Sequence, residues 1–163
     1  LTKYLRRVHM NDGKSTISKQ LVEIFENVMQ VEHEFVNTNV GKKLSMSEIH
    51  TISAVGSDML CSMGEIAEKL HITVGTLTVA INNLVHKGYV ERYKSEKDRR
   101  IVKLGLTKQG KVIFSAHEAF HKNLVDAMIE DLSEEEQVVV SKAMLNLKGF
   151  VDRGYQSIQT AKH

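Results

Sequence analysis

The stretch from Leu70 to Lys111 constrains the fold more than any other part of the chain. Helix-spaced apolar residues come first, two strand-like runs follow on either side of a charged turn, and a new helix begins after Thr107. Residues 86–111 hold nine Lys or Arg and three acidic residues, so their local charge is 9 − 3 = +6. The whole chain carries +2, which leaves +2 − 6 = −4 for the remainder. A basic segment on a mildly acidic body is typical of nucleic-acid binders.

The bulk composition is that of an ordinary globular protein. The 163 residues are 42% hydrophobic and 26% charged, enough for one well-cored domain or a small domain with a dimerisation region. No apolar run approaches the length of a membrane span, and the single Cys61 fits a reducing compartment, so we expect a cytoplasmic protein. The chain begins at Leu1 rather than Met, and we expect residues 1–14 to be a flexible N-terminal extension, with Met10 a candidate natural start.

The first half of the chain predicts a series of helices. Apolar residues at helical spacing indicate an amphipathic helix from about Ser15 to Asn37, within an N-terminal dimerisation segment at 15–44. Capping-box spacings at 45–48 and 62–65 mark two further helix starts, separated by a short strand at 59–61.

The region 45–106 is predicted to be a winged helix-turn-helix domain. Residues 71–73 join two short helices, and the second has Thr73 as its N-cap and one apolar stripe, formed by Leu77, Ala80, Ile81 and Leu84. A hairpin follows directly, with strands at 89–93 and 101–106 around a charged turn. The fold class is therefore mainly α with a small β-wing.

The C-terminal segment, 107–163, predicts two more long helices. Thr107 caps the first, and a capping box at 133–136 opens the second. These helices and the N-terminal one carry more apolar surface than a domain of this size needs internally. We therefore expect them to bury that surface in a homodimer.

Three short motifs in this order resemble the MarR family of winged helix-turn-helix regulators: Gly88-Tyr-Val-x-Arg92, Asp98-x-Arg100 and Leu106-Thr-x-x-Gly110. The resemblance implies a homodimeric, DNA-binding transcriptional repressor of a pseudo-palindromic operator. Recognition helices would enter successive major grooves, and wings would enter the flanking minor grooves. The chain departs from the family at Val79, where arginine is common, and an apolar contact with a thymine methyl becomes the expected alternative.

Within the family, the chain is most similar to the branch that represses fatty-acid biosynthesis genes. The similarity lies in segments such as Thr73-Val-Gly-Thr-Leu-Thr-Val79 and Ser95-Glu-Lys-Asp-Arg-Arg100. It implies no bound cofactor and an acyl-acyl carrier protein as corepressor, for which Lys108, Lys111 and Lys122 are candidate contacts. The alternatives are a zinc-responsive regulator and a repressor that responds to multidrug or phenolic compounds.

The expected DNA contacts lie on the second helix of the motif and on the wing. Thr, Asn and Val side chains suit phosphates and base edges, and basic residues at a hairpin tip suit the minor groove. Asp98 would orient Arg100 through a charge-assisted hydrogen bond. The predicted DNA-binding residues are Thr73, Gly75, Thr76, Thr78, Val79, Asn82, Lys94, Ser95, Lys97, Asp98, Arg99 and Arg100.

A histidine pair, His117 and His121, stands one helical turn apart and is predicted to face inward. With His50 and Phe120 it is a candidate ligand-binding group for the effector. An H-x₃-H pair on a helix binds zinc only if further ligands converge, so the three histidines are metal candidates against the alternative of a hydrogen-bonded cluster at helix contacts. The letters from His117 to His121 also satisfy the metalloprotease pattern H-E-x-x-H, but the helix lies in the expected dimerisation region and we expect no enzyme.

Cys61 and the methionines suggest two further possible roles, as an oxidant sensor and as the lining of a ligand tunnel, each with a structural alternative. A single cysteine is an oxidant sensor only where its pKa is lowered, and nothing in the sequence around Cys61 marks such a thiol. The seven methionines are suited either to an acyl-chain tunnel or, as is more usual at helical spacing, to the core.

Overall fold

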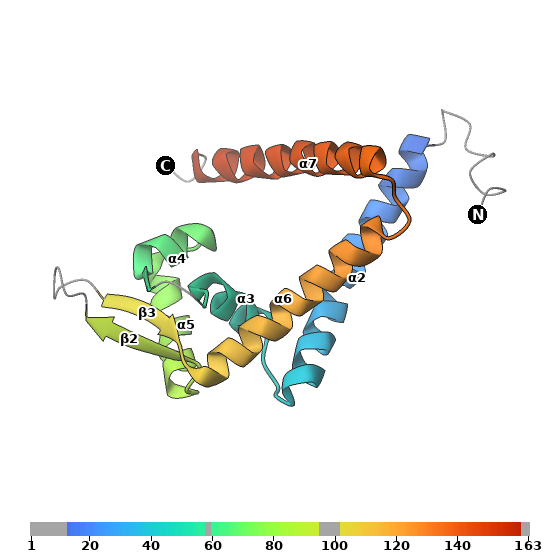
Figure 1. Ribbon diagram of the computed structural model, residues 1–163. Coiled ribbons are helices and arrows are strands. Elements are labelled where there is room, and N and C mark those ends of the chain that lie inside the picture. Colours follow the sequence, from blue (N-terminus) through green and yellow to red (C-terminus); the bar gives the residue numbers. More distant parts are fainter. Residues whose placement is uncertain (1–12, 58–59, 95–101, 161–163) are drawn as a thin grey trace.

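The protein folds into a compact winged helix-turn-helix lobe attached to three long helices, as Figure 1 shows. The computed structural model describes residues 13–57, 60–94 and 102–160. Its elements, in chain order, are α2 (Gly13–Val40), α3 (Met46–Val55), β1 (Cys61–Ser62), α4 (Met63–Lys69), α5 (Val74–His86), β2 (Val90–Lys94), β3 (Val102–Leu106), α6 (Lys108–Ile129) and α7 (Glu134–Thr160).

The expected helix starts are confirmed by their caps. Ser45 and Ser62 each form a complete capping box, with Glu48 and Glu65 respectively. The Oγ1 atom of Thr73 accepts a hydrogen bond from the N–H of Thr76, and Thr107 does the same for Gly110. Such caps satisfy backbone donors that a helix start otherwise leaves unpaired, and each contributes roughly 1 kcal/mol.

Several boundaries differ from the expectations by one to three residues. Gly13 and Lys14 belong to α2 rather than to the N-terminal extension, so the helix begins before Ser15. The hairpin's first strand begins at Val90, because the N–H of Tyr89 still donates to the Leu84 carbonyl in the turn that closes α5.

The short strand expected at 59–61 is found as β1, which begins two residues later and ends one residue later. It pairs antiparallel with β3, Cys61 opposite Leu104 and Ser62 opposite Lys103. Leu60 is not part of it, and Met59 lies outside the described residues. The sheet therefore has three strands in the order β1-β3-β2, and the wing is anchored to the start of α4.

The hydrophobic core fills the space between α3, α4, α5, the sheet and the first half of α6. Its members are apolar side chains that the periodicity placed on inward faces. The largest of those that are completely buried are Ile49, Ile52, Ile66, Leu77, Ile81, Leu84, Leu104 and Ile113. Leu70 and Ala80 are only partly buried, so the stripes on α4 and α5 are narrower than expected.

The motif residues Gly88, Thr107 and Gly110 join the end of α5 to the start of α6. Gly88 has φ +77°, a left-handed conformation that favours glycine. The Oγ1 of Thr107 donates to the Gly88 carbonyl at 2.7 Å, and the Thr107 N–H donates to the Tyr89 carbonyl at 3.1 Å. A Cβ on Gly110 would lie 2.1 Å from that Tyr89 oxygen, so only glycine allows this approach.

The turn between α4 and α5 is strained and contacts the C-terminal helix. His71 has φ +54°, which is uncommon for a residue with a side chain. Its imidazole stacks on the ring of Tyr155 from α7, with centroids 4.0 Å apart and planes 14° from parallel. Figure 1 shows how α7 runs back from the end of α6 toward α4.

The long helices leave much apolar surface uncovered in the single chain. On α7, Val138, Leu145 and Phe150 are each more than 60% exposed, as is Ile17 on α2. The same holds to a lesser degree for Met29, Met128 and Met144, whereas Met46 and Met63 pack against the core. Among the described residues, no helix is long and apolar enough to cross a membrane.

Candidate nucleic-acid interface

Helix α5 presents its polar face to solvent because its apolar stripe packs in the core. Leu77, Ile81 and Leu84 are completely buried. On the opposite side Thr76, Val79, Asn82 and Asn83 are exposed, and Val79 is exposed by 62%. An aliphatic side chain with that exposure, surrounded by small polar groups, is suited to contact with a thymine methyl. Val79 and Asn82 thus lie where the sequence placed them.

The threonines of α5 differ in what they can offer to DNA. Thr73 Oγ1 and Thr76 Oγ1 are 2.9 Å apart and share one hydrogen bond, so one of their two hydroxyl hydrogens stays available for a phosphate. Thr78 instead donates its hydroxyl hydrogen to the Val74 carbonyl at 2.7 Å. Thr78 therefore has only a lone pair and its methyl group left for a ligand.

Gly75 lies in the exposed first turn of α5 without an internal reason to be glycine. A Cβ built there meets only Thr73 Oγ1, at an ordinary contact distance of 3.7 Å. Its backbone also needs no left-handed conformation. The missing side chain is therefore suited to a close approach by something outside the chain, such as a phosphate at the helix N-terminus.

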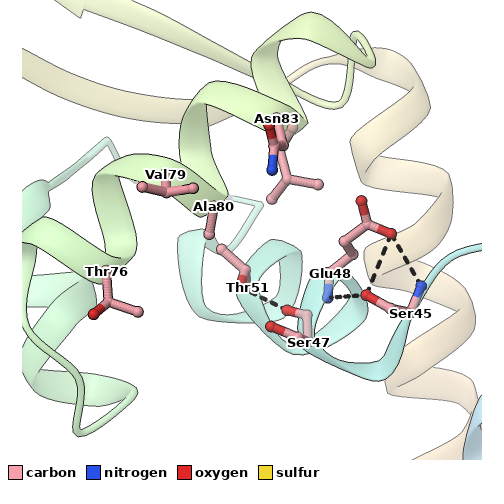
Figure 2. A pocket seen from close by; sticks show the side chains of 9 residues that line it. Ser45, Ser47, Glu48, Thr51, Thr76, Val79, Ala80 and Asn83 are labelled. Atoms are coloured by element: carbon pink, nitrogen blue, oxygen red, sulfur yellow. Dashed lines mark hydrogen bonds between the residues drawn. The ribbon is translucent and has the colours of Figure 1, made fainter.

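The start of α3 borders the same face, which sequence reasoning missed. Figure 2 shows Ser45 and Ser47 on the far side of a hollow from Thr76 and Val79 of α5. The hollow has a volume of about 620 Å³. Its walls are Ser45, Ser47, Glu48, Thr51, Thr76, Val79, Ala80, Asn83 and Leu84. The capping box at Ser45 was recognisable from sequence, but only the packing of α3 against α5 brings these hydroxyls beside the recognition helix.

Glu48 is the acidic group in this wall, and Lys87 neutralises it. Lys87 Nζ donates to Glu48 Oε1 at 2.5 Å across 39 residues of sequence. Burial raises the pKa of Glu48, but hydrogen bonds from Lys87 and from the Ser45 backbone outweigh that effect, and the pKa ends below its ordinary value. The carboxylate thus stays charged and paired instead of repelling a phosphate.

A side-chain hydrogen bond between described residues ties the wing to α5. Arg92 Nη2 on β2 donates to Asn82 Oδ1 on α5 at 2.6 Å. Asn82 keeps its NH₂ group free for an acceptor, whereas its carbonyl oxygen is committed to the wing. Arg92 was part of a family motif, but this positioning role depends on the angle between hairpin and helix and could not be read from the sequence.

Only the base of the wing is described. Strands β2 and β3 pair in register from Val90 opposite Leu106 to Lys94 opposite Val102, and Lys94 is exposed at the outer end. The predicted contacts at the tip lie outside the described residues: Ser95, Lys97, Asp98, Arg99 and Arg100.

The structure also brings together the three histidines that the sequence offered as candidate ligand-binding residues. His50 of α3 and His117 and His121 of α6 surround Glu32 of α2, which is 3% exposed. His117 faces inward as expected, whereas the side chain of His121 is 45% exposed. Glu32 follows the helix periodicity of α2 into this cluster, whereas the ring of the adjacent His33 hydrogen-bonds with the Leu44 carbonyl at 2.6 Å.

An apolar groove lies beside this cluster, between α2 and α6. It has a volume of about 410 Å³ and is lined by Glu23, Ile24, Asn27, Val28, Val31, Phe120 and Leu124. The ring of Phe120 lines the groove and also contacts the cluster, because its centroid lies 5.4 Å from that of His121 and 5.6 Å from that of Phe35. Phe120 thus lies next to His121, as the candidate ligand group required.

Comparison with known proteins agrees with this geometry. Residues 44–102 match the model of the MarR family. The crystal structure of Streptococcus pneumoniae FabT in complex with DNA has a TM-score of 0.77 and 38% sequence identity to this chain, over 86% of this chain and 98% of that one. The HTH-type transcriptional regulator PchR of Bacillus subtilis is 26% identical over 88% of this chain and 82% of its own length. The regulator SarZ of Staphylococcus aureus is 27% identical over 88% of this chain and 94% of its own length.

Proposed function

Because the chain belongs to the MarR family of winged helix-turn-helix transcriptional regulators, we propose that it is a homodimeric repressor of fatty-acid biosynthesis genes, with an acyl-acyl carrier protein as corepressor. The observation that carries the proposal is the exposed face of α5, joined to the wing by Arg92, in a chain that is similar to a FabT–DNA complex along most of its length. The relatives compared above are transcriptional regulators, and we assign this chain the same non-enzymatic role.

DNA binding places α5 in the major groove. The N-terminus of the helix, with Thr73, Gly75 and Thr76, approaches a phosphate, and Val79 and Asn82 contact base edges. Ser45 and Ser47 at the start of α3 add phosphate contacts from the other wall of the hollow. The wing, with Lys94 at its described end, follows the backbone into the minor groove.

Dimerisation supplies the second half-site. The exposed apolar residues on α2 and α7 support a two-fold interface that buries them, because a monomer rarely leaves so many large hydrophobic groups in water. Two copies of α5 related by such an axis match a pseudo-palindromic operator with half-sites about one helical turn apart.

The groove between α2 and α6 supports an acyl effector. Its lining is mainly aliphatic, with Phe120 at one wall, and it lies between helices that connect the dimer region to the DNA-binding lobe. Lys108, Lys111 and Lys122 are exposed along α6 and suit an acidic carrier protein. A ligand that prefers one spacing of the two lobes changes operator affinity by its differential affinity for that state.

The test is operator binding at fixed salt, because salt alone changes such affinities greatly. Fluorescence anisotropy of a labelled fatty-acid synthesis promoter is measured with long-chain acyl carrier protein, with unacylated carrier, and with neither. We expect tighter binding with the acylated carrier only. Equal affinities under the three conditions would contradict the corepressor, and affinity equal to that for scrambled DNA would contradict the target genes.

A further inference from the structure

The connection between α2 and α3 carries two adjacent lysines, Lys42 and Lys43, and both are exposed. The sequence has no acidic residue from position 35 to position 47. Among the described residues, neither lysine takes part in an ion pair, whereas Lys87 of the neighbouring helix α5 is paired with Glu48. The connection therefore offers two positive charges that no carboxylate of the described chain neutralises.

The side chain of Asn37 holds this connection in a defined conformation. Its Oδ1 accepts a hydrogen bond from the N–H of Leu44 at 2.7 Å, and its Nδ2 donates to the Leu44 carbonyl at 3.0 Å. Leu44 itself is 3% exposed and packs in the hydrophobic core. On the other side of the lysine pair, the Lys42 N–H donates to the Asn37 carbonyl at 3.3 Å. Because the backbone is held at both ends, binding through these lysines costs little backbone freedom.

The connection continues one wall of the hollow beside the recognition helix. Ser45, which follows Leu44 directly, lies across that hollow from Thr76 and Val79 of α5, as Figure 2 shows. Two residues of extended chain span about 7 Å at most, so the backbone of Lys43 lies within that distance of the backbone of Ser45. The lysine pair thus borders the surface that is assigned to DNA above.

From this placement we infer that Lys42 and Lys43 bind phosphates of the DNA backbone and extend the DNA-binding surface beyond the recognition helix and the wing. The inference rests on the proposed entry of α5 into the major groove, which brings the flanking phosphates close to the start of α3. Lysine binds phosphate as a point charge and reads no base, so this contact adds affinity that depends on salt and not on sequence.

An acidic protein is the competing partner for the same charges. Lys42 lines a small cavity of about 110 Å³ together with Gln109, which lies in the first turn of α6 between two candidate contacts for the carrier protein. The continuity with Ser45 favours DNA, because Ser45 lines the hollow beside the recognition helix and no residue of α6 does so.

The experiment measures how salt changes the affinity of the full chain for DNA, without carrier protein. Anisotropy titrations use a labelled promoter duplex and a scrambled duplex of equal length. The variant Lys42→Gln/Lys43→Gln should make the slope of log affinity against log salt shallower by about 1.8, since each lost phosphate contact removes about 0.9. At low salt its affinity should fall about fivefold or more, and equally for both duplexes, because the contact reads no sequence.

A matched control removes two charges from the other end of α2. Lys14 and Lys19 are exposed there, and about 1.5 Å of rise per residue places Lys19 roughly 30 Å from Val40 along the helix. Lys14→Gln/Lys19→Gln should keep the wild-type slope, as should Lys42→Arg/Lys43→Arg, which retains both positive charges. Circular dichroism verifies that each variant is folded, and light scattering verifies that its mass in solution is unchanged.

Several results would overturn the inference. Equal slopes for wild type and Lys42→Gln/Lys43→Gln would show that the lysines contact no phosphate, and an equal loss in the control would show an effect of net charge alone. If the lysine variant binds DNA normally but no longer responds to acylated carrier protein, the pair belongs to a protein-binding surface. The scrambled duplex reports phosphate contacts whichever genes the protein controls, so a wrong assignment of target genes is distinguished from a wrong assignment of these lysines.

Discussion

Arg92 on the wing donates a 2.6 Å hydrogen bond to the carbonyl oxygen of Asn82 on the recognition helix. This contact joins the two elements that we propose enter adjacent grooves of DNA. It also orients the Asn82 amide and leaves its NH₂ group, a donor, available to an acceptor outside the chain. One side chain of the wing thereby determines which hydrogen-bonding group the helix presents.

Replacing Arg92 with alanine should therefore weaken operator binding by more than the loss of one charge. Lys94→Ala is the matched control, since it removes a positive charge from the same strand. We expect Arg92→Ala to bind about fivefold more weakly than Lys94→Ala, equivalent to roughly 1 kcal/mol for one hydrogen bond. Anisotropy titrations at several salt concentrations measure both affinities. Indistinguishable affinities would show that the hydrogen bond does not position Asn82 on DNA.

Gly75→Ala should separate folding from DNA binding. The added methyl group meets no close atom of the chain, and alanine favours helix by roughly 0.5–1 kcal/mol over glycine, so the melting temperature should stay equal or rise. If a phosphate approaches this turn, the same methyl group should reduce operator affinity several-fold. Calorimetry and anisotropy on one preparation test the two effects. Full operator affinity would place the phosphate elsewhere.

Gly110→Ala should have the opposite outcome and damage the fold. Its Cβ would overlap the Tyr89 carbonyl oxygen, which itself accepts the hydrogen bond from Thr107. We expect a loss of about 1–3 kcal/mol in the free energy of unfolding, the usual cost of forcing extra atoms into a packed site. Urea denaturation measures it. Gly154→Ala is the control, because no atom lies within 4 Å of a Cβ there.

The Glu48–Lys87 pair predicts a stability difference that depends on pH. The pKa of Glu48 is lowered in the folded state. Its charged form therefore stabilises the fold above the ordinary pKa of 4.5, and this stabilisation is lost as pH falls below that value through the lowered pKa. Glu48→Gln keeps the capping geometry but removes the charge. The difference in unfolding free energy between wild type and this variant should be constant near neutrality and shrink below about pH 4.5. A difference that does not change with pH would contradict the charge pairing.

Arg100→Ala tests the sequence prediction that lies outside the described residues. It should reduce operator affinity markedly, because an arginine in a narrow minor groove interacts with strong negative potential. The apolar faces on α2 and α7 are distant in sequence from the wing, so the oligomeric state should not change. Anisotropy gives the affinity, and light scattering gives the mass in solution. Wild-type affinity would refute the role of Arg100.

Local signals in the sequence predicted most of the fold. The caps at Ser45, Ser62, Thr73 and Thr107 each depend on residues three positions apart, so they could be recognised without a tertiary structure. The pairing of β1 with β3 joins segments about forty residues apart, and the predicted bounds of β1 were wrong by two residues at its start and one at its end. Such non-local pairing is decided by packing rather than by local preference.

In the candidate sites, too, local patterns could be predicted from the sequence, whereas contacts between distant segments could not. The i, i+4 pair of His117 and His121 was visible as a pattern on one helix. The convergence on Glu32 depends on how α2 crosses α6, and the letters carry no information about that crossing. Likewise, Val79 and Asn82 followed from helix periodicity, whereas the role of Arg92 required the angle of the wing.

The stacking of His71 on Tyr155 has a practical consequence for work with this protein. A residue held in the left-handed region at φ +54° stores strain that neighbouring contacts must offset, and Tyr155 is such a neighbour. Trimming the C-terminus before Tyr155, a common step to aid crystallisation, would therefore loosen the turn that sets where α5 begins. If such a shortened protein binds DNA poorly, the cause would be the lost contact between Tyr155 and His71. The weak binding should not be taken to mean that the missing residues contact DNA.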